Sequence, residues 1–258
     1  MRANLHFRKA GHGSKSLCIL HGLFGSADNW QSLGKDFAEA YTVYFIDLRN
    51  HGRSEHQLVH TYEAMAEDLE QLLNQEGIEK AIVLGHSMGG KTAMRFAQMF
   101  ESRVEKLVVA DMGIKEYLPH HQAILEALNS FNPEKIESRS EAETQLRKYI
   151  SEEGVVQFLL KNLYRLKPQG YAWRFNLPIL ESSMPDILEE IPAIEVSVPT
   201  LFIRGEKSNY ILDEDFPSIL KLFPQAVFDT VSNAGHWLHA ENPDEFFAKV
   251  SNFLESAP

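Results

Sequence analysis

The stretch Ala81-Ile82-Val83-Leu84-Gly85-His86-Ser87-Met88-Gly89-Gly90 decides the fold of this chain. Its apolar first half is typical of a strand, and a helical pattern, Lys91–Phe100, follows it. A serine on such a sharp strand-to-helix turn adopts a strained backbone and exposes its hydroxyl, and glycines two residues before and after it leave room for neighbouring backbone. The following helix directs free N–H groups and its dipole at Ser87. Ser87 is therefore the predicted nucleophile, and a glycine-rich turn that only caps a helix is the alternative.

Outside this stretch, short apolar runs alternate with longer amphipathic segments. Each run is continuously apolar rather than alternating, which is typical of strands covered on both faces. Helical spacing recurs in Tyr62–Leu73 and in Phe246–Leu254, the latter after an Asn242-Pro243 helix start. This order predicts an α/β fold with a mainly parallel sheet flanked by helices. The predicted strands are Ser16–Leu20, Val43–Ile46, Ala81–Leu84, Leu107–Ala110, Thr200–Ile203 and Ala226–Phe228.

One region breaks this alternation. Between Lys115 and Ile191 we find helical patterns and no run of buried-strand type, and prolines punctuate its second half. The pattern predicts a helical cap (residues 115–191) inserted between two parts of a core domain (residues 1–114 and 192–258). A separate helical domain with its own function is the alternative. The helical segments are Ile124–Leu128, Glu141–Ile150 and Val155–Leu166.

Composition excludes several classes of protein. The 258 residues are 44% hydrophobic and 24% charged, as in an ordinary globular protein, and the formal net charge of −11 argues against binding to nucleic acid or a membrane surface. A single cysteine, Cys18, rules out a disulfide framework or a multi-cysteine zinc site, so we expect no metal. No run approaches the roughly 18 apolar residues of a membrane span, and the polar N-terminus lacks a secretory h-region. The expected location is the cytoplasm, and the oligomeric state is not indicated.

A serine hydroxyl needs a base to take its proton. His236 is the best-placed histidine because it follows the last strand, where Gly235 permits a tight turn. A core histidine is the alternative reading. We expect the side chain of His86, next to the serine, to point away from it and to take a packing or substrate-side role. The remaining histidines of interest are expected to be solvated: His56, His60, His120, His121 and His239.

The base in turn needs a carboxylate. In the loop Arg204–Tyr210, where an aspartate would be expected, Ser208 stands instead. Asp111 directly follows the strand Leu107–Ala110, at the ligand side of a parallel sheet. We therefore predict Asp111 as the acid and Ser208 as a second hydrogen-bonding partner of the histidine. Asp213 and Asp215 stay open as alternatives.

The oxyanion formed during attack needs two N–H donors, each worth about 2.7–4 kcal/mol in the transition state. One is the backbone N–H of Met88, the residue after the nucleophile. The other is predicted to be the N–H of Leu23, in the glycine-containing loop His21–Ser26. A plain turn is the alternative for that loop.

These residues resemble the α/β-hydrolase superfamily over essentially the whole chain, and within it the YbfF-type esterases. The resemblance implies hydrolysis of carboxylic esters, in part of acyl-thioesters, without a cofactor. The resemblance directly implies Ser87 as nucleophile and His236 as base. It also supports Asp111 as the acid and Ser208 as the further hydrogen-bonding residue. Asp47 and His51 fall in a turn expected to be structural. The matching stretches are His21–Ser26, Asp47–Ser54, Gly85–Lys91 and Trp173–Asn176.

The resulting functional hypothesis is a serine esterase that forms an acyl-enzyme with a small-molecule ester, with the cap setting acyl size. Phe24, His86 and Trp173 are the predicted substrate-binding residues. Carbon–carbon bond hydrolysis or lyase chemistry on the same triad, or a non-catalytic binding protein that retains the fold, are the alternatives. Haloalkane dehalogenase and epoxide hydrolase chemistry need an aspartate nucleophile. Because position 87 is a serine, the sequence argues against both reactions. Further lining residues, with cap core as their alternative role, are Phe131, Phe158, Leu159, Leu163 and Tyr164.

Overall fold

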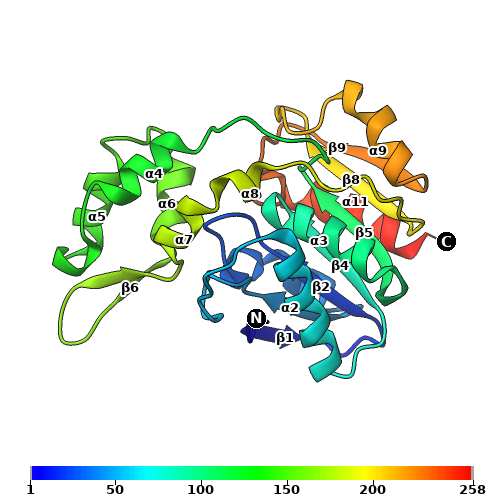
Figure 1. Cartoon of the computed structure of the whole chain (residues 1–258), viewed down its shortest axis with the longest axis horizontal. Coiled ribbons are helices and arrows are strands. Elements are labelled where there is room, and N and C mark those ends of the chain that lie inside the picture. Colours follow the sequence, from blue (N-terminus) through cyan, green and yellow to red (C-terminus); the bar gives the residue numbers. More distant parts are fainter. Residues whose placement is uncertain (1, 257–258) are drawn as a thin grey trace.

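The computed structural model describes residues 2–256, and within them the central sheet has seven strands in the order β1-β3-β2-β4-β5-β8-β9 (Figure 1). Neighbouring strands run parallel except β1 and β3, which pair antiparallel. The predicted α/β-hydrolase architecture is confirmed. The strands are β1 (Phe7–Ala10), β2 (Ser16–Leu20), β3 (Thr42–Ile46), β4 (Ala81–His86), β5 (Val104–Ala110), β8 (Thr200–Gly205) and β9 (Ala226–Val231).

Strand burial follows position in the sheet. The central strand β4 is buried along its whole length, as its continuous apolar run predicts. The edge strand β1 was not predicted because its sequence, Phe-Arg-Lys-Ala, carries two cations and is only half-buried. The prediction that β9 is covered on both faces is wrong. It lies at the other edge, and Val227 is 51% exposed.

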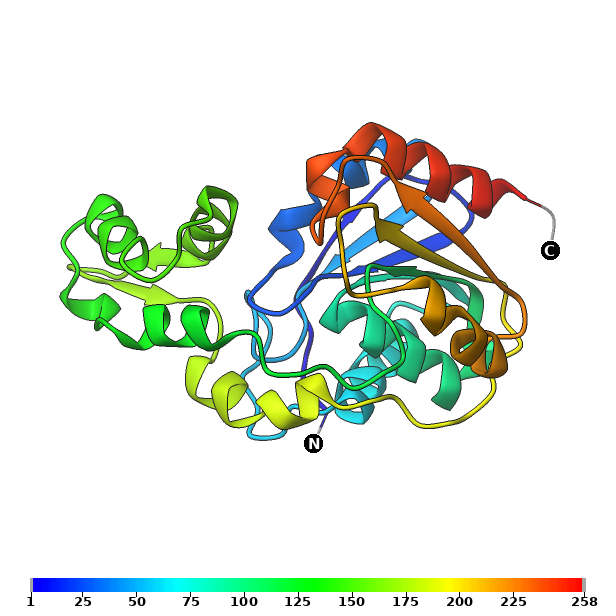
Figure 2. The same cartoon turned by 90° about the horizontal axis from the view of Figure 1, so that it is seen from above.

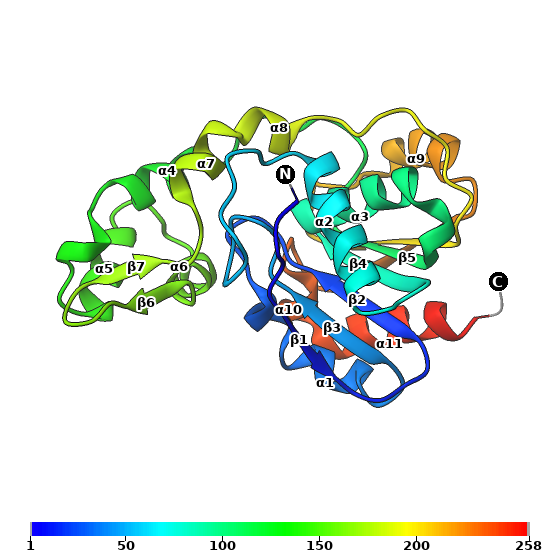
Figure 3. The same cartoon turned by 60° about the horizontal axis from the view of Figure 1, so that its bottom comes forward.

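Helices cover both faces of the sheet (Figures 2 and 3). Cys18 and its same-face neighbours pack with α2, α3 and α9, whereas Leu17 and Ile19 face the opposite cluster with α1 and α11. This division follows from the alternation of side chains along a strand. The core helices are α1 (Leu33–Phe37), α2 (Tyr62–Gln75), α3 (Met88–Met99), α9 (Phe216–Leu222), α10 (Leu238–Glu241) and α11 (Pro243–Glu255), with 3₁₀ turns at Ala27–Trp30, Glu101–Arg103 and Asp213–Asp215.

Between β5 and β8 the chain forms a lobe that projects to one side of the core in all three views. It contains a short hairpin as well as helices, so the expectation of helical structure alone was wrong. Val155–Leu166 is not one helix, because α6 ends at Leu160 and the chain turns back through Gly170, whose φ is 85°. The domain boundaries at 115 and 191 stay a prediction. The lobe comprises α4 (Gln122–Asn129), a 3₁₀ turn (Pro133–Lys135), α5 (Arg139–Leu146), α6 (Glu153–Leu160), β6 (Leu163–Arg165), β7 (Tyr171–Trp173) and α7 (Leu177–Ser182), and α8 (Met184–Leu188) follows between the lobe and the core (Figure 1).

Two segments, residues 113–121 and 187–193, join this lobe to the core, and we call them the necks. They bond to each other through the Ile191 N–H, which donates to the Ile114 carbonyl at 3.0 Å. The Lys91 ammonium, on α3, ties both necks to the core. It donates to the carbonyls of Lys115 (3.0 Å) and Leu188 (3.3 Å) and to that of Glu189. Burial lowers the pKa of Lys91 to about 8.

We predict that Lys91→Met loosens the necks. Methionine fills the stem volume but leaves the neck carbonyls unpaired, which lowers the free energy of unfolding by about 1–3 kcal/mol. Urea denaturation measures this loss, and limited proteolysis measures cleavage at the necks, which should accelerate.

Lys106→Met is the matched control for this variant. The Lys106 ammonium also donates to several backbone carbonyls, but these belong to Phe253, Leu254 and Ser256 at the end of α11. The control should lose comparable stability without faster cleavage at the necks. Equal neck cleavage in both variants would contradict a specific role for Lys91.

Candidate active site

The turn between β4 and α3 holds Ser87 in an unusual backbone conformation, with φ 55° and ψ −122°. The two flanking glycines make it possible. A Cβ at Gly85 would lie 2.1 Å from the Gly89 carbonyl oxygen, and a Cβ at Gly89 would lie 2.5 Å from that of Leu20. The surrounding backbone therefore forces the turn, and the serine stands at the start of the following helix.

Three side chains from distant parts of the chain form one hydrogen-bonded series. The Ser87 Oγ lies 3.0 Å from the His236 Nε2, and the His236 Nδ1 lies 2.7 Å from the Asp111 Oδ2. The three come from the carboxyl ends of β4, β5 and β9, which meet at one edge of the parallel sheet. The structure thus brings together the residues predicted as nucleophile, base and acid.

Asp111 is fully buried, and its carboxylate is satisfied on both oxygens. The Gly205 N–H donates to Oδ1 at 3.1 Å, and the Ser208 hydroxyl donates to Oδ2, which also faces His236. The prediction that Ser208 bonds the histidine is wrong, because the carboxylate lies between them and accepts from both.

The alternative acids lie elsewhere and have other partners. Asp213 accepts from Arg204 at 2.6 Å with its side chain 81% exposed. Asp215 accepts from Lys115 at 2.6 Å. Neither hydrogen-bonds to His236, so Asp111 is the carboxylate in reach of the imidazole.

Burial opposes charge on both members of the histidine–carboxyl pair. It raises the pKa of the Asp111 carboxyl, against the hydrogen bonds of Ser208 and Gly205. It lowers the pKa of the His236 imidazole, and the neighbouring His120 acts in the same direction. A neutral imidazole that donates its Nδ1–H to Asp111 presents a free Nε2 lone pair to Ser87.

The loop after β2 lies beside the serine turn. Phe24 in this loop has φ 57°; its N–H donates to His51 Nε2 at 3.1 Å, and its carbonyl accepts from Asn162 at 2.7 Å. Within residues 2–256, the backbone N–H groups of Leu23 and Met88 donate no hydrogen bond to a protein group. Leu23, Met88 and Ser87 line one cavity, so the residues of the two predicted oxyanion donors lie around the same space as the hydroxyl.

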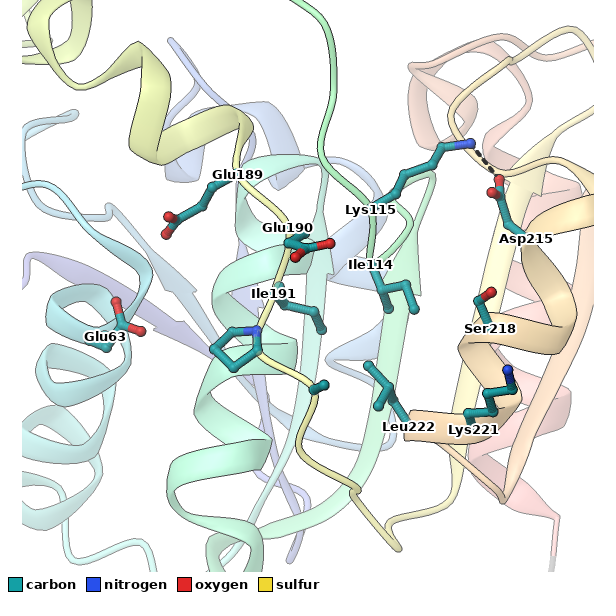
Figure 4. A pocket seen from close by; sticks show the side chains of 12 residues that line it. Glu63, Ile114, Lys115, Glu189, Glu190, Ile191, Asp215, Ser218, Lys221 and Leu222 are labelled. Carbon is teal, nitrogen blue, oxygen red and sulfur yellow. Dashed lines mark hydrogen bonds and ion pairs between the residues drawn. The ribbon is translucent and has the colours of Figure 1, made fainter.

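That cavity is small and mostly apolar, with a few ring nitrogens and hydroxyls. A larger cavity of about 570 Å³ is lined by residues of both necks and of α9, among them the charged Glu189, Glu190 and Lys221 (Figure 4), and none of the residues that line the cavity at Ser87 lines it. Of the three hydrogen-bonded residues, Ser87 is the one that lines the smaller cavity. Its lining is Leu23, Tyr62, Ser87, Met88, Met112, Tyr117, His120, His121, Ile187, Leu188 and Tyr210.

The predicted substrate-binding residues are outside this lining. His86 is buried, and its Nε2 lies 2.8 Å from the His236 carbonyl oxygen. Its ring therefore contacts the main chain of the predicted base and does not face the cavity. The ring of Phe24 packs against Phe175 with ring centroids 5.1 Å apart, and Trp173 stacks on the same Phe175 ring at 5.2 Å. A substrate role for Phe24, His86 and Trp173 stays a prediction.

The further lining residues have different surroundings: Tyr164 is exposed, and Phe131 packs against Trp173 with ring centroids 6.0 Å apart. Leu159 and Leu163 are buried inside the lobe. Phe158 instead faces Trp237 of the core, with ring centroids 6.0 Å apart. None of these residues contributes to the cavity around Ser87.

Two of the histidines expected to be solvated are buried. His60 lies against Asn50 and His51, and His239 stacks on Trp30 with ring centroids 4.1 Å apart and planes 10° apart. That expectation was wrong because a missing acidic or metal partner does not show whether neighbouring rings cover an imidazole. His56 and His120 are exposed, and His121 is half-buried.

Sequence reasoning missed several residues around the cavity, above all Tyr210, His121 and Tyr117. Tyr210 ends the loop Arg204–Tyr210, where the sequence pattern predicts only an acid. Among residues 2–256, no cluster of three or more His, Cys, Asp or Glu side chains could hold a metal ion. In the same range, no helix has the length and apolarity needed to cross a membrane.

Comparison with known proteins now decides the family. A family model described as "alpha/beta hydrolase fold" matches residues 15–243. The chain belongs to the alpha/beta hydrolase family. It is 37% identical to "Esterase YbfF" of Escherichia coli K12 over 98% of this chain and 99% of that protein, which confirms the resemblance to the YbfF-type esterases.

Two further relatives extend this picture. The chain is 40% identical to the "sn-1-specific diacylglycerol lipase ABHD11" of Danio rerio, over 94% of this chain and 79% of that protein. Among solved structures, one titled "Marine microorganism esterase" superposes with a TM-score of 0.95 at 42% identity, covering 97% of this chain and 99% of that one.

Proposed function

We propose that this alpha/beta hydrolase is a serine esterase that hydrolyses carboxylic esters through an acyl-enzyme. The observation that carries the proposal is the series Ser87–His236–Asp111, joined at 3.0 and 2.7 Å beside a cavity. Relatives that match at least 94% of this chain are named as an esterase and a diacylglycerol lipase, which supports ester hydrolysis as the reaction class.

The proposed mechanism uses the groups that lie within hydrogen-bond reach of one another. The Ser87 Oγ attacks the ester carbonyl carbon while the His236 Nε2 takes its proton. The N–H groups of Leu23 and Met88 stabilise the resulting oxyanion. As the C–O bond breaks, the imidazolium returns the proton to the leaving alkoxide. Water then attacks the acyl-enzyme with His236 as base, and the carboxylic acid leaves as Ser87 regains its proton.

Asp111 stabilises the imidazolium that forms in both half-reactions and fixes the Nδ1–H tautomer. A thiolate can replace the alkoxide as leaving group, so acyl-thioesters fall within the proposed range. None of these steps calls for a cofactor. Carbon–carbon bond cleavage on the same residues is less favoured because the similar relatives are named for ester substrates. A non-catalytic binding protein would have no need for all three groups in hydrogen-bond reach.

We predict that Ser87→Ala lowers kcat on p-nitrophenyl esters from acetate to octanoate by roughly 10⁴–10⁶-fold. The substitution deletes only the attacking hydroxyl, so circular dichroism should be unchanged. Labelling by an organophosphonate should disappear with activity. Turnover above a tenth of the wild-type value would contradict Ser87 as nucleophile.

The choice of acid is tested by Asp111→Asn against Asp213→Asn. Asn at 111 removes the charge that stabilises the imidazolium, and kcat should fall about 10³–10⁴-fold. The exposed Asp213 is the matched control, and its variant should stay within about threefold of wild type, as surface substitutions do. Equal losses in steady-state assays would mean that another group is the acid.

The pH dependence follows from the lowered pKa of His236. Only the neutral imidazole accepts the serine proton, and a lower pKa keeps it neutral to lower pH. We therefore expect kcat/KM to be flat above neutrality and to fall on acidification, with a midpoint below the unperturbed value of about 6.5. Initial rates from pH 4.5 to 8.5 measure this midpoint, and a midpoint above 7 would contradict the assignment.

A further inference from the structure

We propose that Tyr210 is a positioning residue that holds the His236 imidazole in line with Ser87, and that His120 links this tyrosine to the neck of the lobe. The inference rests on the proposed function, because it gives His236 the part of base. It adds a connection between the lobe and the reacting groups.

The first observation is a stack. The ring centroids of Tyr210 and His236 are 3.9 Å apart, and their planes differ by 14°. The two hydrogen bonds hold the imidazole by its nitrogens, in the plane of the ring. A parallel aromatic face at contact distance supports the flat side of the ring, which neither hydrogen bond contacts. It also attracts the cation that His236 becomes in each half-reaction.

The second observation is how firmly Tyr210 is held. Its carbonyl accepts from the Tyr117 hydroxyl at 2.8 Å, and that hydroxyl accepts from the Gly113 N–H at 2.7 Å. Its own N–H donates to the Ser208 Oγ at 3.3 Å, and this hydroxyl donates to Asp111. One short loop therefore supports the acid through Ser208 and the base through Tyr210.

The third observation joins this loop to the lobe. The His120 Nε2 lies 2.5 Å from the Tyr210 hydroxyl, and the His120 Nδ1 lies 2.8 Å from the Leu118 carbonyl oxygen. With Nδ1 donating to that carbonyl, Nε2 accepts from the tyrosine. Burial raises the pKa of Tyr210 well above its ordinary value, which keeps its hydroxyl a donor. His120 belongs to the neck formed by residues 113–121. Displacement of this neck therefore shifts the Tyr210 ring, which stacks on His236.

The experiment compares three substitutions in the full-length enzyme. Tyr210→Leu removes both the stack and the link, Tyr210→Phe keeps the stack and removes the link, and His120→Ala removes the link from the other side. Tyr149→Phe, at an exposed tyrosine of the lobe, is the control. The assay is p-nitrophenyl butyrate hydrolysis from pH 4.5 to 8.5, resolved into kcat and KM.

We expect Tyr210→Leu to lower kcat about 10- to 100-fold, as misplacement of a reacting group does, with KM within about threefold. Its acidic limb should move to lower pH, because the imidazolium loses the aromatic face. Tyr210→Phe should restore most of the kcat and the wild-type limb, with a remaining loss of about two- to threefold. His120→Ala should match Tyr210→Phe in kcat, and the double variant Tyr210→Phe/His120→Ala should have a kcat no lower than that of either single variant. Tyr149→Phe should equal wild type.

Three results would overturn the inference: a Tyr210→Leu enzyme with wild-type kcat and pH limb, a Tyr210→Phe enzyme as impaired as Tyr210→Leu, or additive losses in the double variant. If Tyr210→Leu does not fold, the Phe and His120 variants still decide through the same comparison of kcat and additivity. Failure of the proposed function is distinct, because the wild-type enzyme would then neither turn over esters nor take the organophosphonate at Ser87.

Discussion

The close approach of three backbone segments at the end of β4 is the constraint on which the rest of the structure depends. Glycines at positions 85 and 89 let the serine turn pack closely against the end of β2 and the start of α3. This close packing holds Ser87 at φ 55°. The turn cannot relax without separating the central strands from the helix that covers them. The position of the hydroxyl is therefore set by the core of the sheet and not by a mobile loop.

The other groups reach this fixed point from loops, and each is supported by a buried polar contact. Asp111 is held by Gly205 and Ser208, and His236 by its two hydrogen bonds, the ring of Tyr210 and the imidazole of His86. Such contacts are strong where water is excluded and costly where they are incomplete. The arrangement gains rigidity at the price of needing every partner in place.

The sequence carries most of the information on the core and less on its surroundings. Strand runs such as Ala81–Leu84 predict the sheet because only a strand covered on both faces needs so many consecutive apolar residues. The proximity of Ser87, His236 and Asp111 could be predicted because parallel strands end at a common edge. The edge strand β1 and the hairpin β6–β7 could not, since their residues are partly exposed and depend on partners distant in sequence.

Contacts between side chains from separate loops were the hardest to foresee. Ser208 was expected against the histidine but contacts the carboxylate, and His239 was expected in solvent but stacks on Trp30. In both cases the identity of the nearest neighbour depends on how loops lie over one another. Local spacing does not encode that arrangement.

The burial of Cys18 in β2 has a practical consequence. Its side chain is fully covered, and burial raises the pKa of the thiol to about 12, so essentially no thiolate forms near neutral pH. The folded protein is therefore expected not to react with maleimides and other thiol reagents. A pair of cysteines placed on the lobe and on the core would carry spectroscopic labels specifically, and the separation of the two bodies could be followed in the otherwise unaltered molecule.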